Sequence, residues 1–483
     1  MKVRGAIARL TSDSLVYGLG QAAGRMIQII LVPALTRAFT PSQYGVVDLV
    51  LLVATIATMF SVCGMDAALA RFFYEAPNRE ARRAMATTSA VHRLAGGVVL
   101  GGAIALTAQP LSTLILDSPS YAKYLRLLGL SLPFTSFFLF ANEALRVTFQ
   151  PWKYIGLNAV NMVLVGVLTL WFVLGLKLSV AGVFYAKVVG DATAAAAGLL
   201  LLRHTLGGRP SWATLRRMLA YGGPLIPLTL TYSVLTYADR QVLVHMGSLA
   251  DVGVHAVAVK LAAPVLLTVT AFQLAWGPTA FAAATEEDHG AFYARVLSLY
   301  VAGGSLMALG VALFAPEILR TFIPPAYWEA SRAAGLLALA TVANGAYFIA
   351  ALGVNLERKN RWLAIIAGAG AVITIGLAIA SVSRWGVTGV ACATLVGFSL
   401  STVGLYVVSQ RLRPFPYRGL ACLGLFGLAA GLAALSWRLG NAPAALRGVL
   451  WIAFGAVATI FAISRRKTAA PTELGRAAEA GAR

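Results

Sequence analysis

The chain has 483 residues, of which 59% are hydrophobic and 12% charged, with a formal net charge of +21. A mean hydropathy of +0.78 excludes a soluble globular protein, because too few polar residues remain to cover a surface of that size. The basic excess alone does not indicate nucleic-acid binding, since the positions of the charges decide between nucleic acid and membrane.

Hydrophobic stretches recur along the whole chain, and most charges lie in the short gaps between them. Leu94–Leu116 and Tyr154–Leu176, for example, contain no charged residue. A run of about 18 or more such residues is typical of a transmembrane helix. The pattern predicts an all-α membrane protein of about 14 transmembrane helices, at residues 13–35, 45–72, 88–108, 123–146, 155–176, 180–202, 219–245, 252–282, 292–314, 332–355, 362–383, 387–410, 419–437 and 446–464.

A basic segment with two glycines and a proline, Arg203–Arg217, is the best candidate for a linker. It predicts two pseudo-symmetric six-helix lobes, at residues 1–205 and 210–410. Residues 411–464 would add two helices, and residues 465–483 a cytoplasmic tail. A weak internal repeat supports the division, since Leu15–Gln21 and Met218–Pro227 open the two halves with a similar Tyr-Gly pattern. Two parallel repeats would place a substrate site between them, near the midplane.

Basic residues are distributed unevenly between the two sides of the predicted bundle. Most of the 39 lie in the tails and in the gaps on the side of the N-terminus. The opposite gaps hold only Arg37, Lys177, Arg320, Arg384, Arg438 and Arg447. Because cytoplasmic loops are enriched in lysine and arginine, this bias predicts that both termini are cytoplasmic.

Prolines and cysteines add smaller expectations. Prolines concentrate in the seventh and eighth predicted helices, at Pro224, Pro227, Pro264 and Pro278. They predict that these helices bend, and the general enrichment of proline in membrane helices is the equal alternative. The three cysteines lie far apart inside apolar stretches, so we expect small hydrophobic side chains with no disulfide or metal role. No cofactor or metal site is predicted.

Charged residues inside the predicted helices cluster in a few of them. Such residues are costly in hydrocarbon and mark function by default. Arg25 and Lys260 have no acidic residue within a helical turn of sequence, and together with Arg71 and Arg240 they are the candidate substrate-binding cations. An excess of cations favours an anionic, phosphate-bearing substrate. The candidate ion-coupling residues, for sodium or protons, are Asp48, Asp66 and Asp239.

Some of these charges have structural interpretations. Lys187 and Asp191 are four residues apart, so we expect them to neutralise each other, with a transport role as the alternative. His92 and Arg93 are close enough to the cytoplasmic end of their helix to reach the headgroups, and a transport role is the equal alternative.

Several segments resemble a known family. Thr36–Glu75 (TRAFTPSQYGVVDLVLLVATIATMFSVCGMDAALARFFYE) is similar to the signature of the Wzx-type polysaccharide and O-antigen flippases, within the multidrug/oligosaccharidyl-lipid/polysaccharide exporter superfamily. Tyr221–Pro227 (YGGPLIP), Ala238–Val244 (ADRQVLV) and Val252–Pro264 (VGVHAVAVKLAAP) resemble the family pattern in the second half. The chain departs from it at His255, where the family usually has tyrosine. We interpret this as a steric substitution, with pH sensing as the alternative.

The resemblance implies a flippase of the bacterial inner membrane, not an enzyme. It would move undecaprenyl-diphosphate-linked oligosaccharide between leaflets by alternating access. Implied partners are that glycolipid, membrane lipids and possible polysaccharide-assembly proteins, but no nucleic acid. The alternative is a multidrug exporter of the same superfamily, coupled to a cation. No zinc-hydrolase, nucleotide-binding or nucleophile-elbow motif is present.

Overall fold

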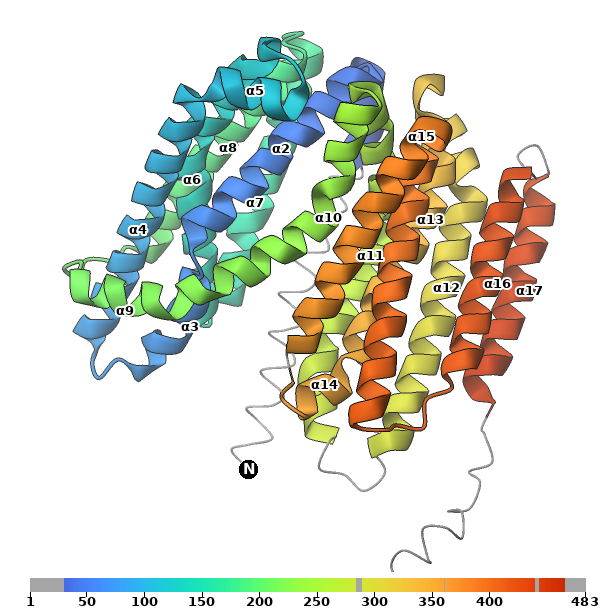
Figure 1. Cartoon of the computed structure of the whole chain (residues 1–483). Coiled ribbons are helices and arrows are strands. Elements are labelled where there is room, and N and C mark those ends of the chain that lie inside the picture. Colours follow the sequence, from blue (N-terminus) through green and yellow to red (C-terminus); the bar gives the residue numbers. More distant parts are fainter. Residues whose placement is uncertain (1–29, 284–288, 360, 439–442, 465–483) are drawn as a thin grey trace, which may run out of the picture.

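The computed structural model describes residues 30–283, 289–359, 361–438 and 443–464. All regular structure within these residues is helical (Figure 1). The first half contains α2 (Pro41–Val62), α3 (Met65–Glu75), α4 (Arg79–Leu106), α5 (Ala108–Leu116), η1 (Pro119–Tyr121), α6 (Ala122–Val147), α7 (Pro151–Leu170), η2 (Trp171–Gly175) and α8 (Val180–Leu202). The rest contains α9 (Trp212–Gly222), η3 (Gly223–Leu225), α10 (Ile226–Met246), α11 (Leu249–Ala283), α12 (His289–Phe322), η4 (Pro325–Tyr327), α13 (Ala330–Ala350), α14 (Leu352–Leu356), α15 (Arg361–Leu412), α16 (Gly419–Arg438) and α17 (Ala444–Ile463).

The described helices account for most of the predicted membrane crossings. Within the described residues, 11 helical spans are long and apolar enough to cross a bilayer. The span Arg361–Leu412 is two helices that meet at Gly386, whose φ of 50° favours glycine. The helix α10 has 21 residues, and residues 30–38 are helical where the first predicted crossing ends; residues 13–29 of that crossing lie outside the described residues. The predicted all-α membrane fold is confirmed.

The helices form two lobes. In the first, α4 and α8 pack on α6, and α7 packs on α8; in the second, α11, α12 and α15 pack on α13. Figure 1 shows the first lobe on the left and the second on the right, with α10 crossing between them. The last two helices, α16 and α17, both pack on α12, as expected for an addition outside the second lobe.

The second predicted helix, at residues 45–72, is two helices in the structure. It begins with a capping box in which Thr40 and Gln43 exchange hydrogen bonds. It breaks at Cys63 and Gly64, which have φ values of 46° and 65°. A Cβ on Gly64 would lie 2.3 Å from the carbonyl oxygen of Gly222, so the break follows from close passage of another backbone.

That second backbone belongs to the seventh predicted helix, which is also broken. It consists of α9, the short 3-10 helix η3 containing Pro224, and α10. Although the sequence places α9 in the second half, it packs against α3 and α4 of the first lobe. The predicted bend is therefore present in this helix. The eighth helix, α11, runs without interruption from Leu249 to Ala283 despite its prolines.

Candidate functional site

The two lobes meet where α2 packs against α11. A Cβ on Gly253 would lie 1.9 Å from the carbonyl oxygen of Pro41, and a Cβ on Gly45 would lie 2.1 Å from that of Leu249. Both distances are far below any real contact, so neither position can carry a side chain in this arrangement. The contact lies close to the first turns of both helices, at the upper end of the molecule in Figure 1.

Tyrosines reinforce this contact. The rings of Tyr44 and Tyr327 meet edge to face, with centroids 6.0 Å apart. The hydroxyl of Tyr327 donates a hydrogen bond of 2.9 Å to the carbonyl oxygen of Phe39. Burial raises the pKa of Tyr327 above its usual range, which keeps this hydroxyl protonated as a donor. The bond therefore links the two lobes across the neutral pH range.

A buried network of charges lies next to the glycine contact. Nε of Arg240, on α10, lies 2.7 Å from Oδ2 of Asp48, on α2. Nη1 of the same guanidinium lies 3.0 Å from Oδ1 of Asp239. The side chains of Arg240 and Asp239 are each 8% exposed and that of Asp48 is 20% exposed. Three of the predicted site residues thus meet, but the two acids neutralise the arginine.

His255 completes this network from α11. Its Nε2 lies 3.2 Å from Oδ2 of Asp239, and its side chain is 0% exposed. Neither ring nitrogen makes a hydrogen bond with proper geometry to the described residues. The residue that departs from the family pattern therefore lies at the contact between the lobes. We refer to Asp48, Asp239, Arg240 and His255 below as the inter-lobe cluster.

Arg71 lies at the other end of the first lobe, on α3. Its Nε is 3.3 Å from Oε1 of Glu75, and its guanidinium lies 4.8 Å from the ring centre of Tyr221. Arg217, on α9, reaches the other oxygen of Glu75 at 3.0 Å. Arg71 is half-exposed and Figure 1 shows α3 at the lower end, whereas Arg240 lies near the upper end of α10. Contrary to expectation, Arg71 and Arg240 do not converge on one chamber in this conformation.

The other predicted site residues lie in separate surroundings. Arg25 falls outside the described residues. Lys260 is half-buried on α11, five residues after His255. Asp66 lines a cavity of about 370 Å³. Its lining comes from α2, α3, α6 and the start of α10, through Thr58, Met59, Val62, Gly64, Ala67, Leu139 and Ile226.

The first lobe also buries an arginine that the sequence places near the headgroups. Arg93 is 2% exposed and its Nε has no hydrogen-bond partner among the described residues. The expected snorkelling is therefore wrong for Arg93, because its face of α4 packs toward Ser61 and α6. Glu143, which the sequence analysis missed, is also buried and lies 2.7 Å from Arg146. The sequence could have identified Glu143, because it is an acidic residue inside a predicted membrane helix.

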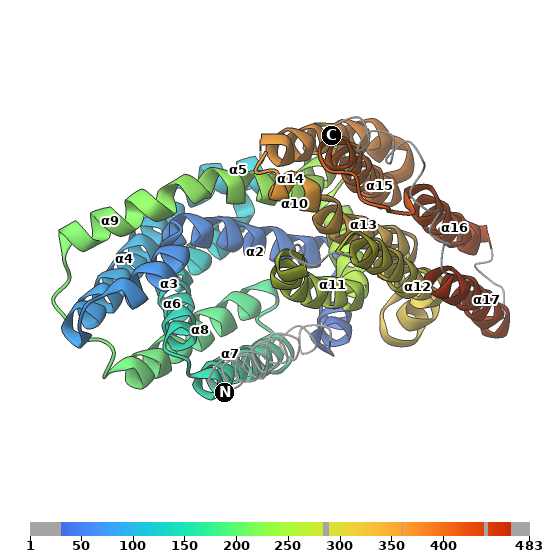
Figure 2. The same cartoon turned by 90° about the horizontal axis from the view of Figure 1, so that it is seen from below.

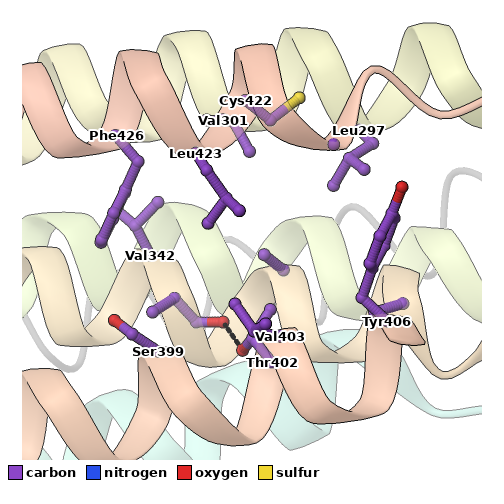
Figure 3. A pocket seen from close by; sticks show the side chains of 14 residues that line it. Leu297, Val301, Val342, Ser399, Thr402, Val403, Tyr406, Cys422, Leu423 and Phe426 are labelled. Atoms are coloured by element: carbon purple, nitrogen blue, oxygen red, sulfur yellow. Dashed lines mark hydrogen bonds between the residues drawn. The ribbon is translucent and has the colours of Figure 1, made fainter. Parts of the chain in front are cut away.

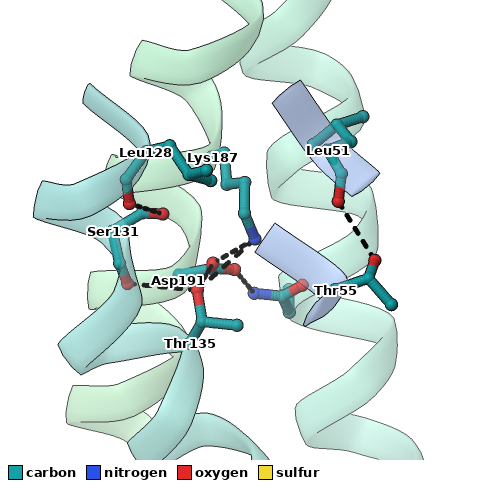
Figure 4. Close-up of polar contacts among 8 residues, drawn as sticks. Leu51, Thr55, Leu128, Ser131, Thr135, Lys187 and Asp191 are labelled. Atoms are coloured by element: carbon teal, nitrogen blue, oxygen red, sulfur yellow. Dashed lines mark hydrogen bonds and ion pairs between the residues drawn. The ribbon is translucent and has the colours of Figure 1, made fainter. Parts of the chain in front are cut away.

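Lys187 and Asp191 form the predicted ion pair, with Nζ and Oδ2 2.6 Å apart (Figure 4). The hydroxyl of Thr135 donates to the same carboxylate oxygen at 2.5 Å, and Nδ2 of Asn161 donates to Oδ1 at 3.2 Å. We refer to these four residues as the intra-lobe cluster, since α6, α7 and α8 all belong to the first lobe. Both oxygens of the Asp191 carboxylate therefore accept hydrogen bonds, as expected if Lys187 and Asp191 neutralise each other.

A second pocket, of about 80 Å³, lies between α12, α13, α15 and α16 (Figure 3). Its lining is apolar apart from a few hydroxyl and thiol groups, and the hydroxyl of Thr402 already donates to the carbonyl oxygen of Ala343. This pocket offers no charged group to a phosphate. Within the described residues, no three His, Cys, Asp or Glu side chains are placed to hold a metal ion.

Comparisons with known proteins agree with this architecture. "Lipid II flippase MurJ, inward closed conformation" has a TM-score of 0.70 and 11% identity, over 92% of this chain and 98% of that one. The inward-facing conformation of a multidrug resistance MATE family transporter of the MOP superfamily has a TM-score of 0.65 and 18% identity, over 84% and 97%. The Vibrio cholerae MATE transporter VcmN in the bent form has a TM-score of 0.56 and 15% identity, over 84% and 96%.

At these identities the likeness shows the fold alone. No curated protein sequence matches the chain at a significant level. A family model described as "Polysaccharide biosynthesis protein" matches residues 10–284, which is more than half of the chain. The resemblance noted in the sequence is thereby confirmed, and the chain belongs to the polysaccharide biosynthesis protein family, with the fold of the MOP-superfamily transporters.

Proposed function

We propose that the chain is a flippase that moves undecaprenyl-diphosphate-linked oligosaccharide from the cytoplasmic to the outer leaflet of the bacterial inner membrane. It would do so by alternating access, with both termini in the cytoplasm, without an enzymatic reaction or a cofactor. The family supports a role in polysaccharide assembly, and the membrane-transporter fold supports movement of a substrate across the bilayer.

The observation that carries this proposal is that the lobes are joined at one end. At the upper end, α2 packs closely on α11 through Gly45 and Gly253. At the lower end, α3 and α9 make no substantial contact with α11–α15 among the described helices. Figure 2 shows α3 and α9 with the first lobe and α14 with the second. One-sided closure is what alternating access requires of each end state, and the charge bias of the gaps assigns the lower end to the cytoplasm.

The proposed substrate-binding cations would then act in sequence. Arg71 is half-exposed at the lower end and could give paired hydrogen bonds to a phosphate arriving from the cytoplasm. Lys260 would act next, and Arg25, which lies outside the described residues, is the remaining proposed cation. Arg240 is held by two carboxylates here and would gain freedom only when Asp48 moves away with the first lobe. The lipid tail would remain in the bilayer.

The test is flipping of a lipid-linked oligosaccharide by the purified full-length chain in proteoliposomes. Lys260→Ala and Arg71→Gln should each lower the initial rate about tenfold, which corresponds to about 1.4 kcal/mol of lost phosphate binding. Arg384→Ala is the control, because it removes an exposed cation that has no ion pair among the described residues. Wild-type rates in well-expressed Lys260→Ala and Arg71→Gln would refute the binding assignment. Export of organic cations without flipping would favour the multidrug exporter instead.

A further inference from the structure

The inter-lobe cluster contains an unbalanced set of charges. Asp48 and Asp239 contribute two negative charges and Arg240 one positive charge. With a neutral imidazole at position 255 the cluster carries a net charge of −1, and with an imidazolium it is neutral. An uncompensated charge is disfavoured in a buried, low-dielectric site. Among these four described residues, the charges therefore balance only when His255 carries a proton.

The 3.2 Å contact with Asp239 identifies the nitrogen of His255 that is nearest to an acidic group. Oδ1 of Asp239 already accepts from the backbone nitrogen of Arg240 at 2.8 Å and from its Nη1 at 3.0 Å. Oδ2 faces Nε2 of His255 at 3.2 Å. A positive charge on the imidazole would thus lie close to the less satisfied oxygen of the carboxylate, even though Nε2 makes no hydrogen bond of proper geometry here.

The helices packed around the imidazole contribute further ionisable groups. From α2 comes Asp48, and from α10 come Asp239 and Arg240. The remaining groups near them are phenols, with Tyr237 under the guanidinium, Tyr44 near Asp48, and Tyr327 against Tyr44. Since the phenols are neutral, they leave the charge count unchanged.

On α11 itself, two charged residues flank His255 along the chain. Asp251 precedes it by one turn, in the first turn of the helix, where its Oδ2 accepts a hydrogen bond of 2.7 Å from the hydroxyl of Ser248. Lys260 follows His255 by five residues. Asp251 and Lys260 are both partly exposed and carry opposite charges, so together they leave the sum of the charges around His255 unchanged.

Only one of the four members of the inter-lobe cluster belongs to the first lobe. If the lobes separate, Asp48 leaves with α2, while Asp239 and Arg240 remain together on α10. The second lobe's part of the cluster is then neutral with an unprotonated imidazole, and Asp48 faces water. Opening the contact therefore removes the electrostatic reason for His255 to hold a proton.

We propose that His255 and Asp239 form a proton-binding site that couples closure of the upper contact to the uptake of one proton. A proton from water on the upper side adds to the lone pair of an imidazole nitrogen as the lobes close, and returns to water when they open; no other bond forms or breaks. This inference rests on the proposed alternating access of the lobes. It gives the transporter a means by which external acid would favour return to the conformation seen here.

The test measures closure directly, without substrate. In the full chain with Cys63, Cys392 and Cys422 replaced by alanine, spin labels at the exposed positions Gln109 and Glu329 report the distance between the upper ends of the lobes. The protein is reconstituted in nanodiscs and compared at about pH 5.5 and about pH 8, which span imidazole titration. One linked proton predicts a closed-to-open ratio that rises by up to about tenfold for each unit that pH falls.

Two variants should lose the response of closure to pH. His255→Gln leaves the charge of −1 in place, so the closed fraction should be low at both pH values. Asp48→Asn makes the cluster neutral without a proton but removes the ion pair with Arg240, so the closed fraction should be the same at both pH values. Structural damage that spares the proton site would lower closure and keep the response. The control is His245→Gln, an exposed histidine at the end of α10, which should keep the wild-type response.

The proposal is overturned if wild-type closure is the same at both pH values, if His255→Gln keeps the wild-type response, or if His245→Gln loses it. Because no substrate is present, these outcomes are separate from the flipping assay. A chain that closes with acid but flips no glycolipid would contradict the proposed substrate and leave the proton site in place.

Discussion

The inter-lobe and intra-lobe clusters contain similar residues, but they join different parts of the molecule. Lys187 and Asp191 lie one turn apart on a single helix, and hydrogen bonds from neighbouring helices of the same lobe complete their shell. Arg240 and Asp48 come from different lobes and lie 192 residues apart in sequence. A balanced pair inside one lobe is expected to stabilise that lobe. A pair that spans two lobes, with unbalanced charge, would contribute to the closed conformation and be lost if the lobes separate.

The largest expected effect comes from blocking the inter-lobe contact sterically. In Gly253→Val the new side chain would overlap the carbonyl oxygen of Pro41, so closure should be abolished. Flipping should fall by at least about a hundredfold, the equivalent of about 3 kcal/mol. The spin-label distance and the flipping rate measure the two effects. Gly102→Ala is the control, since nothing lies within 4 Å of a Cβ there. Normal closure in Gly253→Val would contradict the contact described here.

Removing the shared arginine should shift the conformations without unfolding the protein. Arg240→Gln leaves two carboxylates close together, and breaking such a buried pair costs about 3 kcal/mol. Because opening lets water reach Asp48, we expect this cost to appear as a lower closed fraction, with little change in thermal unfolding. A large fall in the unfolding temperature, with closure unchanged, would show that the cluster serves stability alone.

Breaking the ion pair inside the first lobe should instead lower the stability of the protein and leave the closed fraction unchanged. In Asp191→Ala, Lys187 loses its partner and Thr135 and Asn161 lose an acceptor. The free energy of unfolding should fall by about 2 kcal/mol, somewhat less than for a fully buried pair because Lys187 retains some exposure. Thermal unfolding in detergent and the spin-label distance give the two readouts. An altered closed fraction with normal stability would give this cluster a role in transport, the alternative interpretation of its sequence.

The smallest effect is expected for Tyr327→Phe, which removes one hydrogen bond between the lobes. The loss is about 1 kcal/mol, or a few-fold decrease in the closed-to-open ratio. Because the pKa of Tyr327 is raised, the donor would be lost only as pH rises through that raised value. The ratio of wild type to Tyr327→Phe should therefore stay constant between about pH 5.5 and about pH 8. A ratio that changes over this range would place a titrating group on this hydrogen bond.

Much of the fold could be predicted because membrane helices are specified by local composition. The apolar runs predict the crossings, the turn at Gly386 lies between two predicted helices, and the spacing of Lys187 and Asp191 predicts their ion pair. The break at Cys63 and Gly64 could not be predicted in this way. It depends on the approach of Gly222, which lies far away in the sequence, in the second half of the chain.

The candidate site was less accessible to sequence reasoning. Asp48, Asp239 and Arg240 were identified individually, because each places a charge in an apolar segment. Their mutual neutralisation was not, since it requires α2 and α10 to be brought together. His255 was noticed only as a departure from a family pattern, and the steric interpretation gave no reason to place it beside Asp239.

The sequence by itself determined that this chain is a helical membrane protein with a two-lobe layout, because the length, polarity and spacing of its apolar segments follow from local chemistry. The tertiary structure decided which charges are compensated and at which glycines a side chain would overlap a neighbouring helix. Those properties depend on the distance between groups on separate helices, and the one-dimensional pattern does not contain that distance.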